Sequence, residues 1–189
     1  EDLNLIVSEA DRCKKIVSGL LQFARKNKVD FESVDVREIV ARCTRALHVP
    51  ENIEVHTAHD GDYTEAELDR DQIAQVLTNL ASNAIAAMPQ GGKLSILTNG
   101  DADKVRFIVS DTGIGIPPTN RKKIFEPFFT TKPAGEGTGL GLAVSYGIVK
   151  MHHGDIKVES NADAAAGPTG TTFTVTLPRR RLIQAVNGK

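Results

Sequence analysis

The sequence has 189 residues, of which 40% are hydrophobic and 25% are charged, an ordinary composition for a soluble globular protein. Its formal net charge is −1, it has no tryptophan, and only 5% of its residues are aromatic, which argues against a nucleic-acid-binding protein. The two cysteines, Cys13 and Cys43, lack metal-ligand spacing, and no apolar run approaches the roughly 18 residues of a membrane span, so we expect free thiols in a cytoplasmic chain without a membrane segment.

The first 28 residues are predicted to form one long amphipathic helix. Its apolar residues alternate spacings of three and four, as in the seam of a helix bundle. They are Leu3, Ile6, Ala10, Cys13, Val17, Leu20 and Ala24. A lone helix of this kind leaves its apolar face in water, so we favour dimerisation or docking over packing on its own domain. Because the chain also lacks an initiator methionine, we interpret it as a fragment of a longer protein.

From residue 29 to residue 178 the hydrophobic periodicity predicts one domain of alternating strands and helices. The expected helices cover residues 36–48, 70–88, 118–124 and 140–152. The expected strands cover residues 34–36, 53–57, 93–98, 104–110, 155–159 and 171–177. Asp35 is placed to cap the first of these helices. Residues 179–189 are expected to form a basic tail exposed to solvent.

A glycine-rich stretch over residues 135–142 runs into the helix predicted from residue 140. It matches neither the P-loop pattern nor the dinucleotide-binding pattern of glycines. Gly137, Gly139 and Gly141 would let the backbone approach an anion closely, and a helix N-terminus offers unpaired amides and a positive dipole end. The stretch therefore indicates a phosphate site, with a flexible linker as the alternative.

Asp111 ends a predicted strand and is followed by Gly113 and Gly115, which leave room for a flat ring against the backbone. A carboxylate only accepts hydrogen bonds, so it would welcome the exocyclic amine of adenine and repel the carbonyl oxygen of guanine. The alternative is an aspartate that only holds the turn before Gly113.

Asn79 and Asn83 are four residues apart and share one face of a predicted helix. Asparagine is a poor residue for a helix interior, so the pair suggests a site, although surface asparagines are common. The amide oxygen of Asn83 suits Mg²⁺, which takes few protein ligands beside phosphate oxygens. Lys132, in an aperiodic stretch that we expect to form a lid, is the first candidate for countercharge, ahead of Arg121, Lys122 and Lys123.

Taken together, four stretches resemble the ATP-binding domain of sensor histidine kinases in both order and spacing. They are residues 79–88, 111–117, 125–129 and 137–142, which resemble the N box, the first glycine box, the phenylalanine box and the second glycine box. The resemblance implies an α/β two-layer sandwich of the Bergerat type. In it, a mixed sheet is covered by helices on one face. The first 28 residues would be the second helix of the family's dimerisation and phosphotransfer bundle.

By this resemblance, Asn83 would bind Mg²⁺ and Asp111 would bind the adenine amine of ATP or ADP. The second glycine box, with Thr138 and Leu140 among its glycines, would contact the phosphates. Thr171, inward on the last strand, would reach the adenine through water. The implied partners are an acceptor histidine on a helix of the same or a second kinase chain and the receiver domain of a response regulator. The full-length protein would be a homodimer.

Two departures from the family pattern qualify the interpretation. The family's phosphoacceptor histidine lies in an acidic motif on the first bundle helix, so we expect no catalytic residue of that kind in this chain. The histidines present lie in other contexts: His48, His56, His59, His152 and His153. His56 and His59 are expected to face solvent or lie in a loop. Many members carry a lysine where this chain has Ala86.

Related ATPases that hydrolyse ATP carry a glutamate near the position of Asn79, which argues here for a transferase. The predicted function is therefore the ATP-binding catalytic part of a histidine kinase, with a nucleotide-gated interaction module without kinase activity as the alternative.

Overall fold

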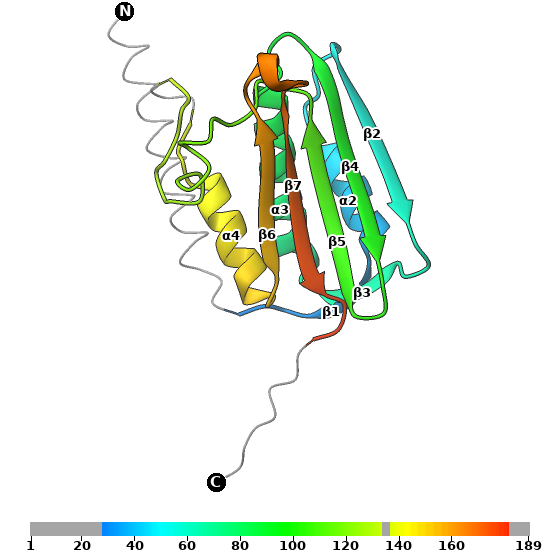
Figure 1. Ribbon diagram of the computed structural model, residues 1–189. Coiled ribbons are helices and arrows are strands. Elements are labelled where there is room, and N and C mark those ends of the chain that lie inside the picture. Colours follow the sequence, from blue (N-terminus) through cyan, green and yellow to red (C-terminus); the bar gives the residue numbers. More distant parts are fainter. Residues whose placement is uncertain (1–27, 134–136, 182–189) are drawn as a thin grey trace, which may run out of the picture.

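The computed structural model describes residues 28–133 and 137–181 (Figure 1). The predicted N-terminal helix with Cys13 lies outside these residues, except for Lys28. The same holds for residues 134–136 of the expected lid and residues 182–189 of the tail. Within the described ranges, no helix combines the length and the apolar character that crossing a membrane requires.

The centre of the domain is a five-stranded sheet with strand order β2-β4-β5-β7-β6. Its strands are β2 (Ile53–Asp60), β4 (Gly92–Gly100), β5 (Lys104–Asp111), β6 (Asp155–Asn161) and β7 (Gly170–Pro178). β2 pairs with β4 in parallel, whereas the other neighbours are antiparallel, so the sheet is mixed as predicted.

Three helices cover one face of this sheet: α2 (Val36–Ala46), α3 (Arg70–Ala86) and α4 (Gly141–Met151) (Figure 1). Side chains alternate along the strands, so every second residue points toward the helices. On β7 the buried residues are Thr171, Phe173, Val175 and Leu177. The predicted core face of α3 is buried throughout, with Ile73, Val76, Leu77, Leu80 and Ala84, and Met88, which was predicted to lie on the same helix, is buried just beyond its end. The two-layer α/β sandwich is confirmed.

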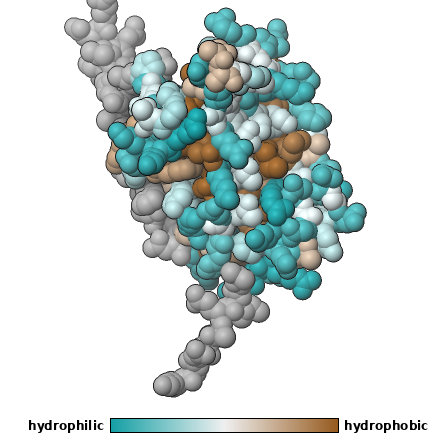
Figure 2. Space-filling view, viewed as in Figure 1, coloured by the Kyte–Doolittle hydropathy of each residue, from teal (hydrophilic) through white to brown (hydrophobic). Residues whose placement is uncertain are grey.

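The other face of the sheet is turned toward the viewer in Figure 1. In Figure 2 the same view shows apolar residues grouped among polar ones across the strands. The apolar pair Leu97 on β4 and Ile108 on β5 lies directly opposite in the strand register, and both residues are half-buried. Ser110 and Thr172, with hydroxyl oxygens 2.9 Å apart, lie on the next strand positions of this face.

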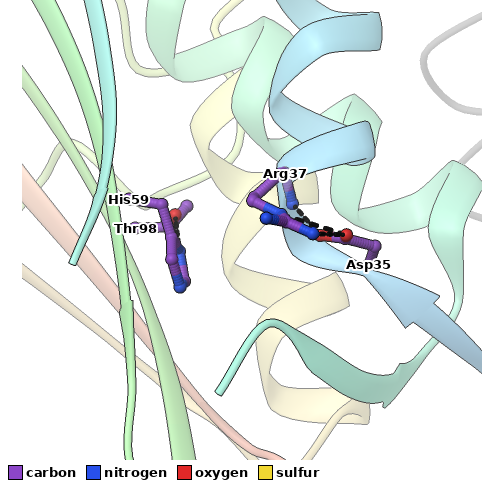
Figure 3. A network of polar contacts seen from close by, with 4 residues as sticks. All are labelled: Asp35, Arg37, His59 and Thr98. Carbon is purple, nitrogen blue, oxygen red and sulfur yellow. Dashed lines mark hydrogen bonds and ion pairs between the residues drawn. The ribbon is translucent and has the colours of Figure 1, made fainter. Parts of the chain in front are cut away.

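Two helices begin at aspartates whose carboxylates accept backbone N–H groups. Asp35 accepts from Arg37 at 2.9 Å, as predicted, and Asp69 accepts from Gln72 at 3.0 Å. The Arg37 side chain also hydrogen-bonds Asp35, and this contact holds the pKa of the Asp35 carboxyl below its ordinary value (Figure 3). These caps satisfy amides that the helices themselves leave unpaired.

The structure corrects three expectations. Residues 118–124 form successive turns instead of a helix. Their backbone N–H groups mostly reach back three residues, as from Asn120 to Pro117, and two adjacent prolines disfavour a helical start. His59 lies on β2 and contacts Thr98 with its Nδ1 at 2.7 Å from the hydroxyl oxygen (Figure 3). Finally, β3 (Glu65–Leu68), which was not predicted, pairs with β1 (Glu32–Asp35).

The start of the basic tail is also held by the domain more firmly than expected. The backbone N–H of Arg179 donates to the backbone carbonyl of Asp103 at 2.8 Å, and the Arg179 guanidinium lies 4.6 Å from the ring centre of Tyr63. The backbone N–H of Arg181 donates to the Glu67 carboxylate at 2.7 Å. Arg180 and Arg181 themselves remain exposed.

His152, which directly follows α4, joins that helix to the start of α3. Its ring is 2% exposed, its Nδ1 lies 2.9 Å from the Ile148 carbonyl, and its Nε2 receives the backbone N–H of Asp69 at 3.2 Å. A carbonyl only accepts, so Nδ1 carries the proton and the ring is neutral. Burial also lowers the pKa of His152, because a charged ring would lose its hydration in this position.

We expect His152→Gln to flatten the acid side of the domain's stability profile. The folded-state pKa of His152 is lowered, so below its ordinary value of about 6.5 the unfolded chain takes up a proton that the native state refuses. Wild-type stability should therefore fall as the pH drops from about 6.5 through that lowered pKa, by about 1.4 kcal/mol for each pH unit that separates the two pKa values. Urea unfolding at several pH values measures this.

His56→Gln is the matched control, since His56 is exposed on β2. It should keep the wild-type profile, and an equal flattening in both variants would contradict the role given to His152.

Candidate functional site

A cavity of about 730 Å³ lies between α3, the ends of β5 and β7, and the loops that carry the two glycine-rich stretches. This volume falls within the roughly 300–1,000 Å³ of typical small-molecule sites. Most of the residues selected from the sequence line it: Asn83, Asp111, Gly115, Lys132, Gly137, Thr138, Gly139, Gly141 and Thr171. Asn79, Gly113 and Leu140 are not among the lining residues.

Asp111 and Thr171 form the sheet side of the cavity. They are direct partners across β5 and β7, and both follow the alternation that points toward the helices. The Asp111 carboxylate accepts the backbone N–H of Gly113 at 2.9 Å. Burial raises the pKa of Asp111, although the backbone N–H groups of Gly113 and Thr171 oppose that shift. The site therefore presents a half-buried carboxylate whose charge has lost part of its hydration.

Ser160 on β6, which the sequence did not reveal, connects Thr171 to the first glycine stretch. Its hydroxyl oxygen accepts the backbone N–H of Ile116 at 2.7 Å and donates to the carbonyl of Gly170 at 2.8 Å. Since its single proton is used, the Thr171 hydroxyl must donate to Ser160, 2.9 Å away. Thr171 therefore offers only lone pairs to the cavity.

The first glycine stretch crosses directly over the end of β6. Gly115 has a φ of +72°, and a Cβ added there would lie 2.0 Å from the carbonyl oxygen of Asn161. Arg121 supports the crossing, because its guanidinium donates to the carbonyls of Ser160 and Ile116. Only glycine fits this position, since both the backbone angle and the space exclude a side chain.

The second glycine stretch enters α4 through an equally close contact. Gly139 has a φ of +67°, and an added Cβ would lie 2.3 Å from the carbonyl carbon of Phe128. The helix begins after Leu140, and among the described residues no side chain caps its first amides. Gly141, the first residue of this helix, lines the cavity, and an uncapped helix start at a cavity wall is the arrangement that favours an anion.

The two asparagines of α3 are used differently. Asn83 lines the cavity, and its side-chain amide makes no hydrogen bond within the described ranges. Asn79 donates from its side-chain nitrogen to the carbonyl of Gly141 at 3.1 Å and to the hydroxyl of Ser145 at 3.2 Å. Asn79 therefore contacts the wall of the cavity from behind, while Asn83 offers a free amide to it.

Asp111 and Lys132 are the charged residues among the described residues that line the cavity. Lys122 and Lys123 do not line it, and Arg121 is committed to backbone carbonyls. Ala86 lines the cavity without offering any charge.

The aromatic stretch forms part of the cavity rim. The ring of Phe125 packs on Tyr146 at 5.4 Å and on Phe173 at 6.5 Å, which ties the loop to α4 and β7. Phe129 lines the cavity. Phe128 is 58% exposed and has a φ of 68°, which is unusual for a residue with a side chain.

Comparisons with known proteins agree with this geometry. Residues 68–181 match the family described as histidine kinase-, DNA gyrase B-, and HSP90-like ATPase. The sensor kinase CckA of Brucella abortus is 39% identical over 94% of this chain, and the signal transduction histidine-protein kinase AtoS of Escherichia coli is 35% identical over 94%. The chain spans 20% and 29% of the lengths of these two relatives.

Among solved structures, a mycobacterial sensor histidine kinase MprB superimposes with a TM-score of 0.67 at 29% identity, covering 81% of this chain and all of that one. The catalytic domain of histidine kinase ThkA gives a TM-score of 0.67 at 32% identity over 80% of this chain and 97% of that one. ThkA in complex with response regulator protein TrrA gives 0.74 at 30% identity, over 93% of this chain and 50% of that chain.

We expect Asp111→Asn to stabilise the ligand-free domain at neutral pH. The raised folded-state pKa means that ionised Asp111 destabilises the native state above that pKa, and an amide removes the charge while it keeps the acceptor for Gly113. The melting temperature of the variant at pH 7 should therefore lie above that of the wild type. The gain should shrink as the pH falls through the raised pKa toward 3.8, the ordinary value.

Asp163→Asn provides the control, because Asp163 makes the same contact with an N–H two residues later, at 2.9 Å, but is exposed. Differential scanning calorimetry at pH 7 and pH 4 compares the variants. A pH-independent gain for Asp111→Asn, or an equal gain for Asp163→Asn, would contradict the burial argument.

Proposed function

Since the chain belongs to the family of histidine kinase-, DNA gyrase B- and HSP90-like ATPases, we propose that its cavity binds ATP with Mg²⁺ and presents the γ-phosphoryl group to a histidine on a partner helix. The observation that carries the proposal is the convergence of three unlike groups on one cavity. A half-buried carboxylate, an unpaired amide and an uncapped helix start lie around it, at Asp111, Asn83 and Gly141.

The sheet side of the cavity suits the adenine base. The Asp111 carboxylate accepts a hydrogen bond from the exocyclic amine, and Thr171 offers a second acceptor because its own hydroxyl proton is donated to Ser160. A guanine carbonyl at the same place would face the Asp111 carboxylate across a partly desolvated gap. The arrangement therefore favours adenine over guanine nucleotides.

The α4 side suits the phosphates. The first amides of α4 are uncapped by described side chains, and the helix dipole adds partial positive charge at the same point. Lys132 is the cation that lines the cavity in the described ranges, so it is the first candidate to balance phosphate charge where other members use a lysine and this chain has Ala86.

The free amide of Asn83 suits Mg²⁺. A hard cation takes oxygen ligands and needs few from the protein when phosphate oxygens supply others. When bound, Mg²⁺ neutralises charge on the phosphates. Asn83 would hold the ion against α3 through its amide oxygen, and the chain would contribute position and charge balance to the transfer rather than covalent chemistry.

The lining favours transfer to a partner over hydrolysis. Among the described residues that line the cavity, Asp111 is the only carboxylate, and it is placed at the base end. Asn79, near the position where hydrolysing relatives carry a glutamate, holds the backbone of Gly141 and has no basic group. Without a base to activate water, bound ATP would persist until an imidazole arrives.

The remaining assignments follow from the family. Residues 1–28 would belong to the dimerisation and phosphotransfer bundle, residues 29–178 to the catalytic domain, and the parent protein would act in the cytoplasm as a homodimer. The acceptor histidine would lie on a helix of the same or a second kinase chain. ThkA has been solved with a response regulator, which supports a receiver domain as the next partner.

We expect Asp111→Ala to weaken ATP and ADP about 10- to 100-fold, the effect of losing a charged hydrogen-bond acceptor. Asn83→Ala should instead abolish the gain in ATP affinity that Mg²⁺ provides, with little effect on binding in EDTA. Isothermal titration calorimetry with and without Mg²⁺ separates the two effects. Asp163→Ala and Asn99→Ala, on an exposed turn and on the open sheet face, should bind like wild type. Wild-type affinity in both site variants would show that the site is misassigned.

With radiolabelled ATP, the chain alone should not label itself, whereas an added helical bundle carrying the acceptor histidine should become labelled. Transfer should be lost in Asp111→Ala and when the acceptor histidine is replaced. Nucleotide binding without transfer under all conditions would favour the alternative of a nucleotide-gated interaction module. Labelling of the chain alone would contradict the absence of an acceptor from it.

A further inference from the structure

A buried polar contact links α3 to the first turn of α4 directly behind the cavity. Ser145 on α4 is fully buried, and its hydroxyl donates to the carbonyl of Gly141 at 2.9 Å. The side-chain nitrogen of Asn79 on α3 donates to the same carbonyl at 3.1 Å and to the Ser145 hydroxyl oxygen at 3.2 Å. The three residues form one closed set of hydrogen bonds.

The donors and acceptors in this set leave one arrangement of protons. The Gly141 carbonyl only accepts, so the Asn79 atom that faces it is the amide nitrogen. Ser145 spends its single proton on the same carbonyl, and its oxygen can then only accept from Asn79. A flipped Asn79 amide would set its oxygen against that carbonyl. Ser145 therefore holds the Asn79 amide in the orientation that the Gly141 carbonyl requires, by accepting the second N–H of that amide.

Gly141, whose carbonyl accepts from both side chains, is part of the candidate phosphate site. Gly141 is the first residue of α4 and lines the cavity. A Cβ added to Gly141 would lie 3.7 Å from the side-chain amide carbon of Asn79, so Asn79 lies in contact with the backbone there. The helix start has no side-chain cap in the described ranges, and the contact from Asn79 ties its first carbonyl to α3.

We propose that Ser145 is a positioning residue for the triphosphate end of the nucleotide. Acting through Asn79, it holds the first turn of α4 at the place where its amides meet phosphate. This rests on the proposed ATP site. The contacts for the base are on β5 and β7 and use neither Ser145 nor Asn79, so the two ends of the ligand depend on different supports.

The test compares ATP with adenosine, which has the base and ribose without phosphates. Ser145→Ala should weaken ATP about five- to tenfold, the effect of a lost hydrogen bond, and leave adenosine affinity unchanged. Thr78→Ala is the matched control on α3. Its hydroxyl donates to Ala74 at 2.8 Å and lies 3.7 Å from Cys43 of α2, so neither ligand should be affected.

A double-mutant cycle tests the route through Asn79. In an Asn79→Ala background, Ser145→Ala should lose most of its effect on ATP, because the side chain that it orients is gone. Equal weakening of ATP and adenosine, or an undiminished effect in that background, would overturn the proposal and leave Ser145 a merely structural residue.

Ser145→Cys keeps the shape and a weak donor, so it serves if the alanine variant is too unstable to study. It should lie between wild type and alanine in the ratio of ATP to adenosine affinity, and a wild-type ratio would overturn the proposal. If the wild-type chain itself fails to bind ATP, the proposed function fails. If the wild type binds and Ser145→Ala keeps its ratio, only the role of Ser145 fails.

Discussion

The site depends on two places where backbone touches backbone at the rim of the cavity. Gly115 lies against the end of β6, and Gly139 lies against the turn that carries Phe128. At each place a side chain would fall within 2.0 or 2.3 Å of another backbone atom, and φ is positive. Because the loops are pressed onto the scaffold in this way, the space between them and α3 is left for a ligand.

Several polar groups around that space lower the stability of the ligand-free domain. Asp111 is half-buried, Asn83 is left without a side-chain partner, and the start of α4 has no side-chain cap in the described ranges. A domain built for stability alone would satisfy or remove such groups. By contrast, the polar groups behind the cavity are fully used, as Ser160 and Ser145 show. Polar groups without a partner therefore line the cavity, whereas polar groups with partners hold the lining in position.

The helical layer connects the site to the opposite end of the domain. α3 and α4 are joined near the cavity by Asn79 and at the far end by His152, whose ring receives the N–H of Asp69. The chain enters at that far end. The backbone N–H of Asp30 donates to the Asp69 carboxylate at 3.2 Å, and the ring of Phe31 packs on His152 at 5.5 Å. The segment that leads in from residue 28 is thus fastened to both helices that build the cavity.

The sequence alone determined the class of fold, the order of most elements and most of the lining of the cavity. Hydrophobic periodicity predicted α3 and the β4–β5 hairpin, and Asp35 indicated the start of α2. Burial on one face and helix capping each depend on a few neighbouring residues, so both are visible in a short stretch of sequence. β3 was not predicted, since it has only four residues and is separated from its pairing partner β1 by 29 residues of chain, so no local pattern marks the pair. A helix was predicted over 118–124 because a single proline suits the first position of a helix. The structure forms turns there, since a proline followed by a second proline disfavours helical geometry.

Only the tertiary structure decided how the site residues are supported. Asn79 and Asn83 look equivalent in the sequence, yet one lines the cavity and the other holds Gly141, because α4 packs beside only the first of them. Ser160 and Ser145 gave no usable signal in isolation. A serine hydroxyl acquires its role from the partners that packing brings within reach. The carbonyl that accepts from Ser160 lies 10 residues away in the chain, and the Asn79 amide that donates to Ser145 lies 66 residues away.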